Sequence, residues 1–103
     1  PPVIMTMIKP SRFIEEESSS EKLVVSAYPN PSAHDFILLT HSGSKKTLIL
    51  RISDQWGRVI ESRAEVPSRG SLRIGGRYRP GMYYAEFWQG SDKVVVKMIK
   101  LAH

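Results

Sequence analysis

The sequence predicts an all-β fold, an Ig-like antiparallel β-sandwich of about seven strands. Short apolar and β-branched segments recur between turn signals at intervals of about 8–12 residues, which is the spacing of a sandwich. Glycine, proline, asparagine and aspartate provide these turn signals. No stretch of the chain shows sustained helical periodicity. The 103 residues suit a single domain with one modest core.

Each predicted strand is a short apolar segment with a turn signal at its ends. Alternation is clearest between residues 47 and 53, where Leu48, Leu50 and Ile52 would share one buried face. The predicted strands are residues 23–28, 36–40, 47–53, 58–64, 71–75, 82–89 and 92–101.

Four turns fix where these strands end. Pro29-Asn30-Pro31 stops the first strand, because the two prolines lack backbone donors and hold the residue between them extended. The next signal predicts a type I turn in which Asp54 accepts a backbone hydrogen bond and Gly57 takes a positive φ. Pro80-Gly81 predicts a type II turn. Gly90-Ser91 predicts a two-residue II′ turn.

The two-residue turn fixes the register of the closing hairpin. One face then collects a core set of Tyr83, Ala85, Phe87, Val94, Val96 and Met98. The other face collects Tyr84, Glu86, Trp88, Lys93, Val95 and Lys97. Two large aromatic residues beside lysines on an outer face indicate either cross-strand stabilisation or a docking surface, and the residues alone leave both interpretations open.

Residues 1–22 differ from the rest and predict an upstream segment and a linker, followed by the sandwich domain at residues 23–103. Val3–Ile8 is an apolar run that could end an upstream domain or add as a strand to a second copy, giving a strand-swapped dimer. Residues 15–22 contain four of the ten acidic residues and no apolar one, which predicts a flexible linker. The candidate cleavage linker comprises Glu15, Glu16, Glu17, Ser18, Ser19 and Ser20.

The formal net charge of +5 favours anionic partners. The arginines between residues 69 and 79 come without a stacking motif, so no nucleic-acid partner is expected. The chain has no cysteine, and His34, His41 and His103 lack metal-ligand spacing. No nucleophile elbow or phosphate-binding glycine loop is present. We therefore predict no metal, no cofactor and no enzymatic activity.

Four motifs in order resemble the C-terminal sorting domain of the type IX secretion system. They are Tyr28–Pro31, Ile52–Val59, Tyr78–Tyr84 and Lys93–Leu101, and the resemblance covers about residues 23–101. It implies a parent cargo protein upstream, export across the inner membrane by a Sec signal, transit through the periplasm, and passage through an outer-membrane translocon to the cell surface or beyond. In many cargos a surface sortase then removes the domain, whereas other members keep it. The resemblance also implies that protein partners such as translocon, shuttle or sortase components recognise the domain, and that the domain catalyses nothing.

The resemblance and the residues together give a list of expected sites. The family's recurring positions correspond to Asn30, Asp54, Gly57, Arg58, Gly81 and Tyr83, most of which are turn or core positions here. The recognition candidates are Arg58, Lys93, Lys97, Lys100, Tyr84 and Trp88. We predict that a partner reads the last strand along an exposed sheet edge, and that any cleavage falls between Ser11 and Lys22. An Ig- or fibronectin-like adhesion or carbohydrate-binding module is the alternative, since Tyr84 and Trp88 could form an aromatic platform.

Overall fold

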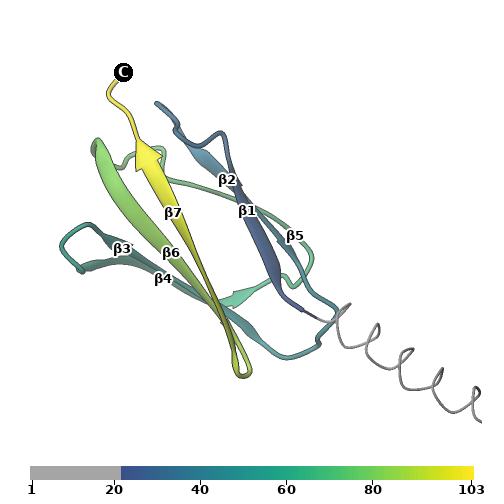
Figure 1. Ribbon diagram of the computed structural model, residues 1–103. Helices are drawn as coiled ribbons and strands as arrows, with labels where there is room; N and C mark the ends of the chain where they lie inside the picture. Colours follow the sequence, from purple (N-terminus) through teal and green to yellow (C-terminus); the bar gives the residue numbers. More distant parts are fainter. Residues whose placement is uncertain (1–21) are drawn as a thin grey trace, which may run out of the picture.

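In a computed structural model the described residues, 22–103, form two antiparallel sheets packed face to face (Figure 1). This confirms the predicted all-β sandwich, and this part of the chain contains no helix. The predicted linker Glu15–Ser20 and the apolar run Val3–Ile8 lie outside the described residues. The seven strands are β1 (Val24–Tyr28), β2 (Phe36–His41), β3 (Leu48–Asp54), β4 (Val59–Val66), β5 (Gly70–Ile74), β6 (Gly81–Gln89) and β7 (Asp92–Lys100).

The strand order shows which strands lie at the edges of the two sheets. One sheet has the order β1-β2-β5 and the other has the order β4-β3-β6-β7. The closing hairpin has the predicted register, with Gln89 opposite Asp92 and Tyr83 opposite Met98. β7 therefore ends as an edge strand of the larger sheet, and its position beside β6 is visible in Figure 1.

The core lies between the two sheets. Leu48, Leu50 and Ile52 of β3 are fully buried, as the alternation predicted. Burying a side chain of this size contributes about 1.5–3 kcal/mol. Val94 and Val96 of β7 are partly buried and pack against the core. The buried cluster comprises Leu23, Phe36, Leu38, Leu48, Leu50, Ile52, Val66, Ile74, Tyr83, Ala85, Phe87 and Met98.

Two of the predicted turns have the expected geometry. At the β3–β4 turn the Gly57 N–H donates to the Asp54 carbonyl at 3.0 Å, and Gly57 has a φ of 86°. The Asp54 carboxylate accepts from the Trp56 N–H at 2.9 Å. Gly90 has a φ of 62° and Ser91 has a negative φ, which is the pattern of a II′ turn.

The predicted type II turn at Pro80-Gly81 is wrong. Gly81 is already the first residue of β6, and its φ of 151° is far from the value of about 80° that such a turn requires. The tight turn lies earlier, where the Tyr78 N–H donates to the Gly75 carbonyl at 3.1 Å. The reason is that the Tyr83 hydroxyl donates to the carbonyl of Arg79 at 2.6 Å, a tyrosine corner that fixes the chain entering β6.

Candidate functional site

Four of the predicted recognition residues lie together on the outer face of the β6–β7 hairpin. Trp88 stands opposite Lys93, and Tyr84 stands opposite Lys97. Because successive side chains of a strand point to opposite faces, these four residues share the side of the sheet that faces away from the core. We call this surface the hairpin face; its residues are Tyr84, Glu86, Trp88, Lys93, Val95 and Lys97.

The hairpin face combines an ordered cation–π contact with exposed apolar area. The Lys93 ammonium lies 4.6 Å from the centroid of the Trp88 ring, a contact that contributes about 0.5–1 kcal/mol at an exposed site. Val95 is 48% exposed, and Ile49 of β3, the register partner of Trp88, is 44% exposed. Trp88 and Lys93 therefore make the contact that cross-strand stabilisation requires, and the same face keeps exposed apolar surface, which a docking surface requires.

The chain segment after β1 covers the C-terminal end of the β7 edge. We call this segment, Asn30–Ser32, the edge clip. The Ser32 N–H donates to the Ile99 carbonyl at 3.0 Å, and the Leu101 N–H donates to the Ser32 carbonyl at 2.8 Å. The Asn30 side-chain amide donates to the Lys97 carbonyl at 2.8 Å and accepts from the Ile99 N–H at 3.0 Å. Asn30 thus acts as part of a strand pairing and not only as a turn residue.

The preceding part of the β7 edge stays open. In an antiparallel pair, the backbone N–H and C=O groups of every second β7 residue point away from β6. The backbone groups of Ile99 bind the edge clip, so Ile99 and the residues two, four and six positions before it point this way. Lys93 and Val95 belong to the same set. Among the described residues no strand pairs with β7 on the side away from β6, although β1 of the other sheet lies close to β7. We call Lys93–Lys97 the open edge. Its outward N–H and C=O groups can pair with an added strand.

Lys100 differs from the expectation, because it does not lie at the surface. It is only 3% exposed, and its ammonium donates to the carbonyls of His34, Gly75 and Gly76. Lys100 lies two residues after the fully buried Met98 on the same strand, so both side chains point to the core side of the sheet. Its predicted role as a surface contact is therefore wrong; it joins the end of β7 to the segment before β2 and to the turn after β5.

Arg58 lies at the β3–β4 turn, apart from the hairpin face. Its Nε donates to the Asp54 carboxylate at 2.8 Å, and its guanidinium lies 5.6 Å from the Trp56 ring centroid. Burial alone would raise the pKa of Asp54, but hydrogen bonds from the backbone and side chain of Arg58 and from the Trp56 N–H outweigh it and hold that pKa below its ordinary value. Asp54 is therefore the ionised anchor of this turn.

Within residues 22–103 there is neither a candidate metal site nor a candidate membrane helix. No set of three or more His, Cys, Asp and Glu residues in this range could hold a metal ion. His34 and His41 are exposed. Asp35 pairs with Arg73 at 3.0 Å. No helix in the same range is long and apolar enough to cross a membrane.

The comparisons with known proteins agree with this arrangement. A search of curated proteins found no match. The family model of the secretion-system C-terminal sorting domain matches residues 26–101, which include nearly all of the two sheets. That family consists of sorting signals and not of enzymes, and it implies a cargo protein, contact with secretion machinery, and export through the outer membrane. The chain belongs to the C-terminal sorting domains of the type IX secretion system.

Proposed function

We propose that the export machinery recognises this sorting domain at the open edge and the hairpin face together. The observation that supports this proposal is the stretch Lys93–Lys97 at the edge of a four-stranded sheet, where only the Lys97 carbonyl, among the outward backbone groups, has a hydrogen-bond partner in residues 22–103. A partner strand added there would pair with the main chain, and its alternate side chains would contact the hairpin face. Lys93 and Lys97 favour an acidic partner strand, while Val95 offers apolar area.

The edge clip limits the partner strand to a short pairing. The clip already takes the carbonyl of Lys97 and both backbone groups of Ile99. Each added hydrogen bond contributes about 0.5–1.5 kcal/mol net, so the few remaining groups give a weak association. Weak pairing suits a signal that must be released after each passage. The sequence of the partner strand, more than its length, would then set its specificity.

A proline scan of β7 tests recognition at the open edge. Proline at position 95 removes an N–H that points outward, whereas proline at position 96 removes an N–H that pairs with β6. We expect Val95→Pro to fold but to leave a reporter, fused upstream of the domain, in the periplasm. Val96→Pro is the control that is expected to unfold. Normal surface display of the folded Val95→Pro fusion would contradict recognition at this edge.

The arrangement of Trp88 favours a protein partner over a carbohydrate. A sugar ring would need to stack on an open aromatic face, and the Lys93 ammonium covers one face of Trp88. Glycan binding by the isolated domain, with normal export of the Val95→Pro fusion, would reverse this preference.

We also propose that a surface sortase cleaves the chain between Ser11 and Lys22. Leu23 is only 3% exposed and belongs to the core, so a cut before it leaves every strand in place. Sequencing the N-terminus of the released domain is the test. A new terminus within residues 23–101 would contradict the proposal.

The apolar run Val3–Ile8 gives a separate proposal, a strand-swapped dimer. The open edge of a second copy is a pairing site for such a strand. Light scattering with and without residues 1–10 tests this; an unchanged mass in solution would contradict it.

A further inference from the structure

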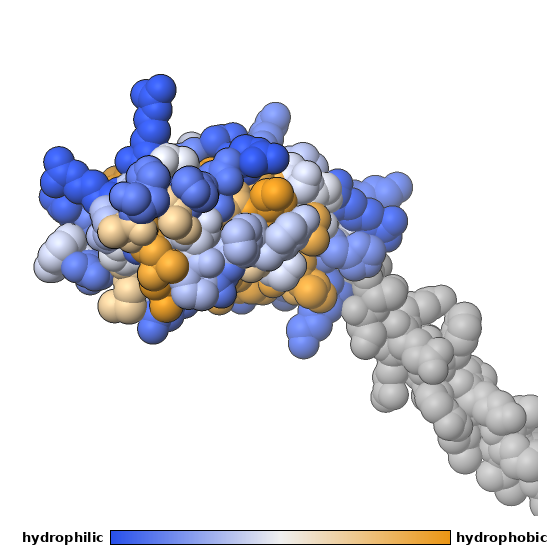
Figure 2. All heavy atoms as spheres, turned by 90° about the horizontal axis from the view of Figure 1, so that it is seen from above, coloured by the Kyte–Doolittle hydropathy of each residue, from blue (hydrophilic) through white to orange (hydrophobic). Residues whose placement is uncertain are grey.

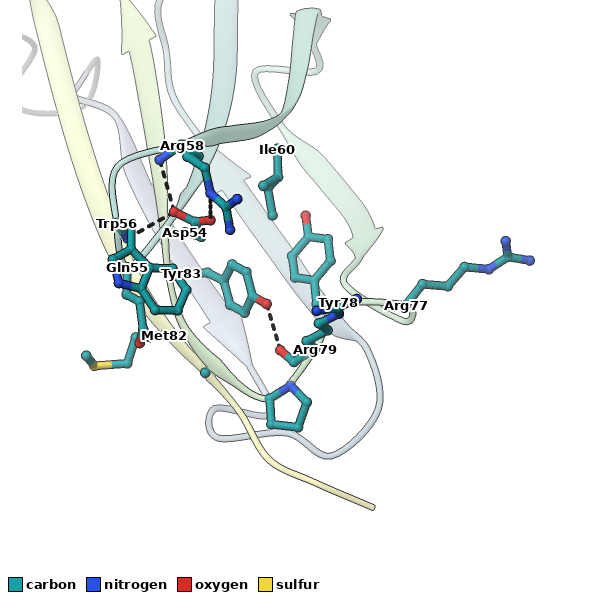
Figure 3. Close-up of a pocket in the computed structure, with 12 residues that line it drawn as sticks. Asp54, Gln55, Trp56, Arg58, Ile60, Arg77, Tyr78, Arg79, Met82 and Tyr83 are labelled. Atoms are coloured by element: carbon teal, nitrogen blue, oxygen red, sulfur yellow. Dashed lines mark hydrogen bonds and ion pairs between the residues drawn. The ribbon is translucent and has the colours of Figure 1, made fainter.

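A cavity of about 560 Å³ lies at the end of the sandwich where the β3–β4 turn is, and no residue of the hairpin face lines it (Figure 3). The β3–β4 turn forms one wall, and the segment between β5 and β6 forms the other. Its lining is aromatic, apolar and cationic: Trp56, Tyr78, Pro80 and Tyr83 alternate around it with arginine side chains. Trp56 is 72% exposed, an unusual position for the largest side chain of a domain with its own closed core.

Arg58 presents donors to this cavity. Its Nε is held by Asp54, and its side chain is 73% exposed. Its two terminal nitrogens make no hydrogen bond within residues 22–103, and in Figure 3 the guanidinium lies beside the Asp54 carboxylate, on the side of Ile60 and Tyr78. A guanidinium fixed at one nitrogen and open at the other two is arranged to bind a carboxylate in bidentate fashion.

The charge around the cavity is not balanced by the domain itself. Asp54, the acidic residue of the lining, is buried and already accepts hydrogen bonds from Trp56 and Arg58. Arg77 and Arg79 have no carboxylate within ion-pair distance among the described residues, and in Figure 3 Arg77 extends from the rim toward solvent. Residues 22–103 contain 13 Lys and Arg against 6 Asp and Glu. Hydrophilic residues also dominate the face drawn in Figure 2.

The walls are fixed before any ligand arrives. The Tyr83 hydroxyl is held by the Arg79 carbonyl, and the Tyr78 hydroxyl donates to Glu61 at 2.7 Å. Burial and the hydrogen bond to Glu61 raise the pKa of Tyr78, so its phenol stays protonated. The two rings pack with their centroids 4.7 Å apart. A site built in this way loses little conformational freedom when a ligand binds.

We propose that this cavity binds a short acidic peptide segment of a partner protein, at a site separate from the export contact. One carboxylate pairs with the terminal nitrogens of Arg58, and an apolar neighbour of that carboxylate packs on Ile60 and Pro80. Tryptophan, tyrosine and arginine together are the side chains that dominate protein–protein contacts. A sugar would require several side chains that bond its hydroxyl groups, and besides the buried Asp54 the lining offers only Gln55 among amide and carboxylate side chains.

The test is a selection of displayed random peptides on the full chain, followed by calorimetry with a synthetic copy of an enriched peptide. We expect enriched sequences to place Asp or Glu next to an apolar residue. Arg58→Gln should weaken the synthetic peptide at least tenfold. Arg73→Gln is the matched control, because it loses the same charge and a similarly exposed ion pair outside the cavity, and its affinity should stay within about twofold of wild type.

A second variant keeps the test decisive if Arg58→Gln fails to fold. Trp56→Ala leaves the Trp56 N–H and the Arg58 ion pair in place, and it should also weaken the peptide at least tenfold. Absence of any enriched peptide, enrichment without acidic residues, or equal binding to Arg58→Gln and Arg73→Gln would overturn the proposal. A sulfated oligosaccharide that binds through Arg58 when no peptide does would overturn it as well. Export of the reporter fusion is a separate measurement, so either proposal can fail alone.

Discussion

The two halves of β7 place the same residue type in opposite environments. Lys100, near the end of the strand, is buried on the carbonyls of three residues from other parts of the chain. Lys93 and Lys97 are exposed on the hairpin face. The edge clip covers the half that contains Lys100 and leaves the other half open. One half of the strand is an anchor, and the other half is a display surface.

The comparison teaches how a sheet edge can be displayed without becoming a hazard. An unpaired edge strand invites non-specific pairing with other chains, and proteins limit this risk with charges and with short open stretches. Here the open edge is flanked by Lys93 and Lys97, and the clip shortens it. The anchored half also keeps the open half from fraying, because a strand end held by few contacts opens readily. The division of the strand that protects the edge is therefore the same division on which the proposed recognition depends.

The largest effect is expected at the anchor. Lys100→Met removes the ammonium that donates to the carbonyls of His34, Gly75 and Gly76, and each group left unsatisfied costs about 1–3 kcal/mol. The Gly75 carbonyl keeps the hydrogen bond from the Tyr78 N–H. We expect the free energy of unfolding to fall by about 3 kcal/mol in urea denaturation, allowing for rearrangement around the site. Lys97→Met, at an exposed position three residues earlier on the other face of β7, should change it by less than about 0.5 kcal/mol. Equal stability of the two variants would remove the distinction between anchor and display.

The clip should give the next largest effect. Asn30→Ala removes both side-chain hydrogen bonds to β7, and the net loss is about 1–2 kcal/mol. The amide of Ile99 should then exchange its hydrogen at least tenfold faster, approaching the rate at Val95. Native-state hydrogen exchange measures both amides in one experiment. If wild-type Ile99 already exchanges as fast as Val95, the clip does not protect the edge.

On the open half, a double-mutant cycle should give a smaller number. Substituting Trp88 and Lys93 by alanine, singly and together, isolates their cation–π contact. We expect a coupling free energy of about 0.5–1 kcal/mol, because the ammonium stays in contact with water. Urea denaturation of the four proteins measures it. A coupling near zero would show that Lys93 is available entirely to a partner.

The sequence predicted the strands and the hairpin faces far better than the anchor. Alternation and a two-residue turn act over short distances, so the positions of Leu50 and Trp88 follow from local rules. The pairing of Asn30 with β7 joins residues 67 and 69 positions apart, and no local pattern encodes it. The prediction placed Lys100 at the surface because lysine is charged. Met98 lies two residues earlier on the same strand and is buried, which already indicated that Lys100 faces inward. The tyrosine corner at Tyr83 has a different cause: its acceptor, the Arg79 carbonyl, is only four residues away, but it belongs to the segment where the sequence favours a turn at Pro80-Gly81.

The smallest effect on stability should accompany a large effect on export. Lys97→Glu changes an exposed side chain that makes no side-chain ion pair among residues 22–103, so the free energy of unfolding should shift by less than about 0.5 kcal/mol. If an acidic partner strand reads the open edge, the same reversal of charge should sharply reduce surface display of an upstream reporter. Lys45→Glu makes the same charge change at an exposed position outside every strand and should leave display intact. Display lost equally in both variants would mean that net charge, and not the open half of β7, is what the export machinery senses.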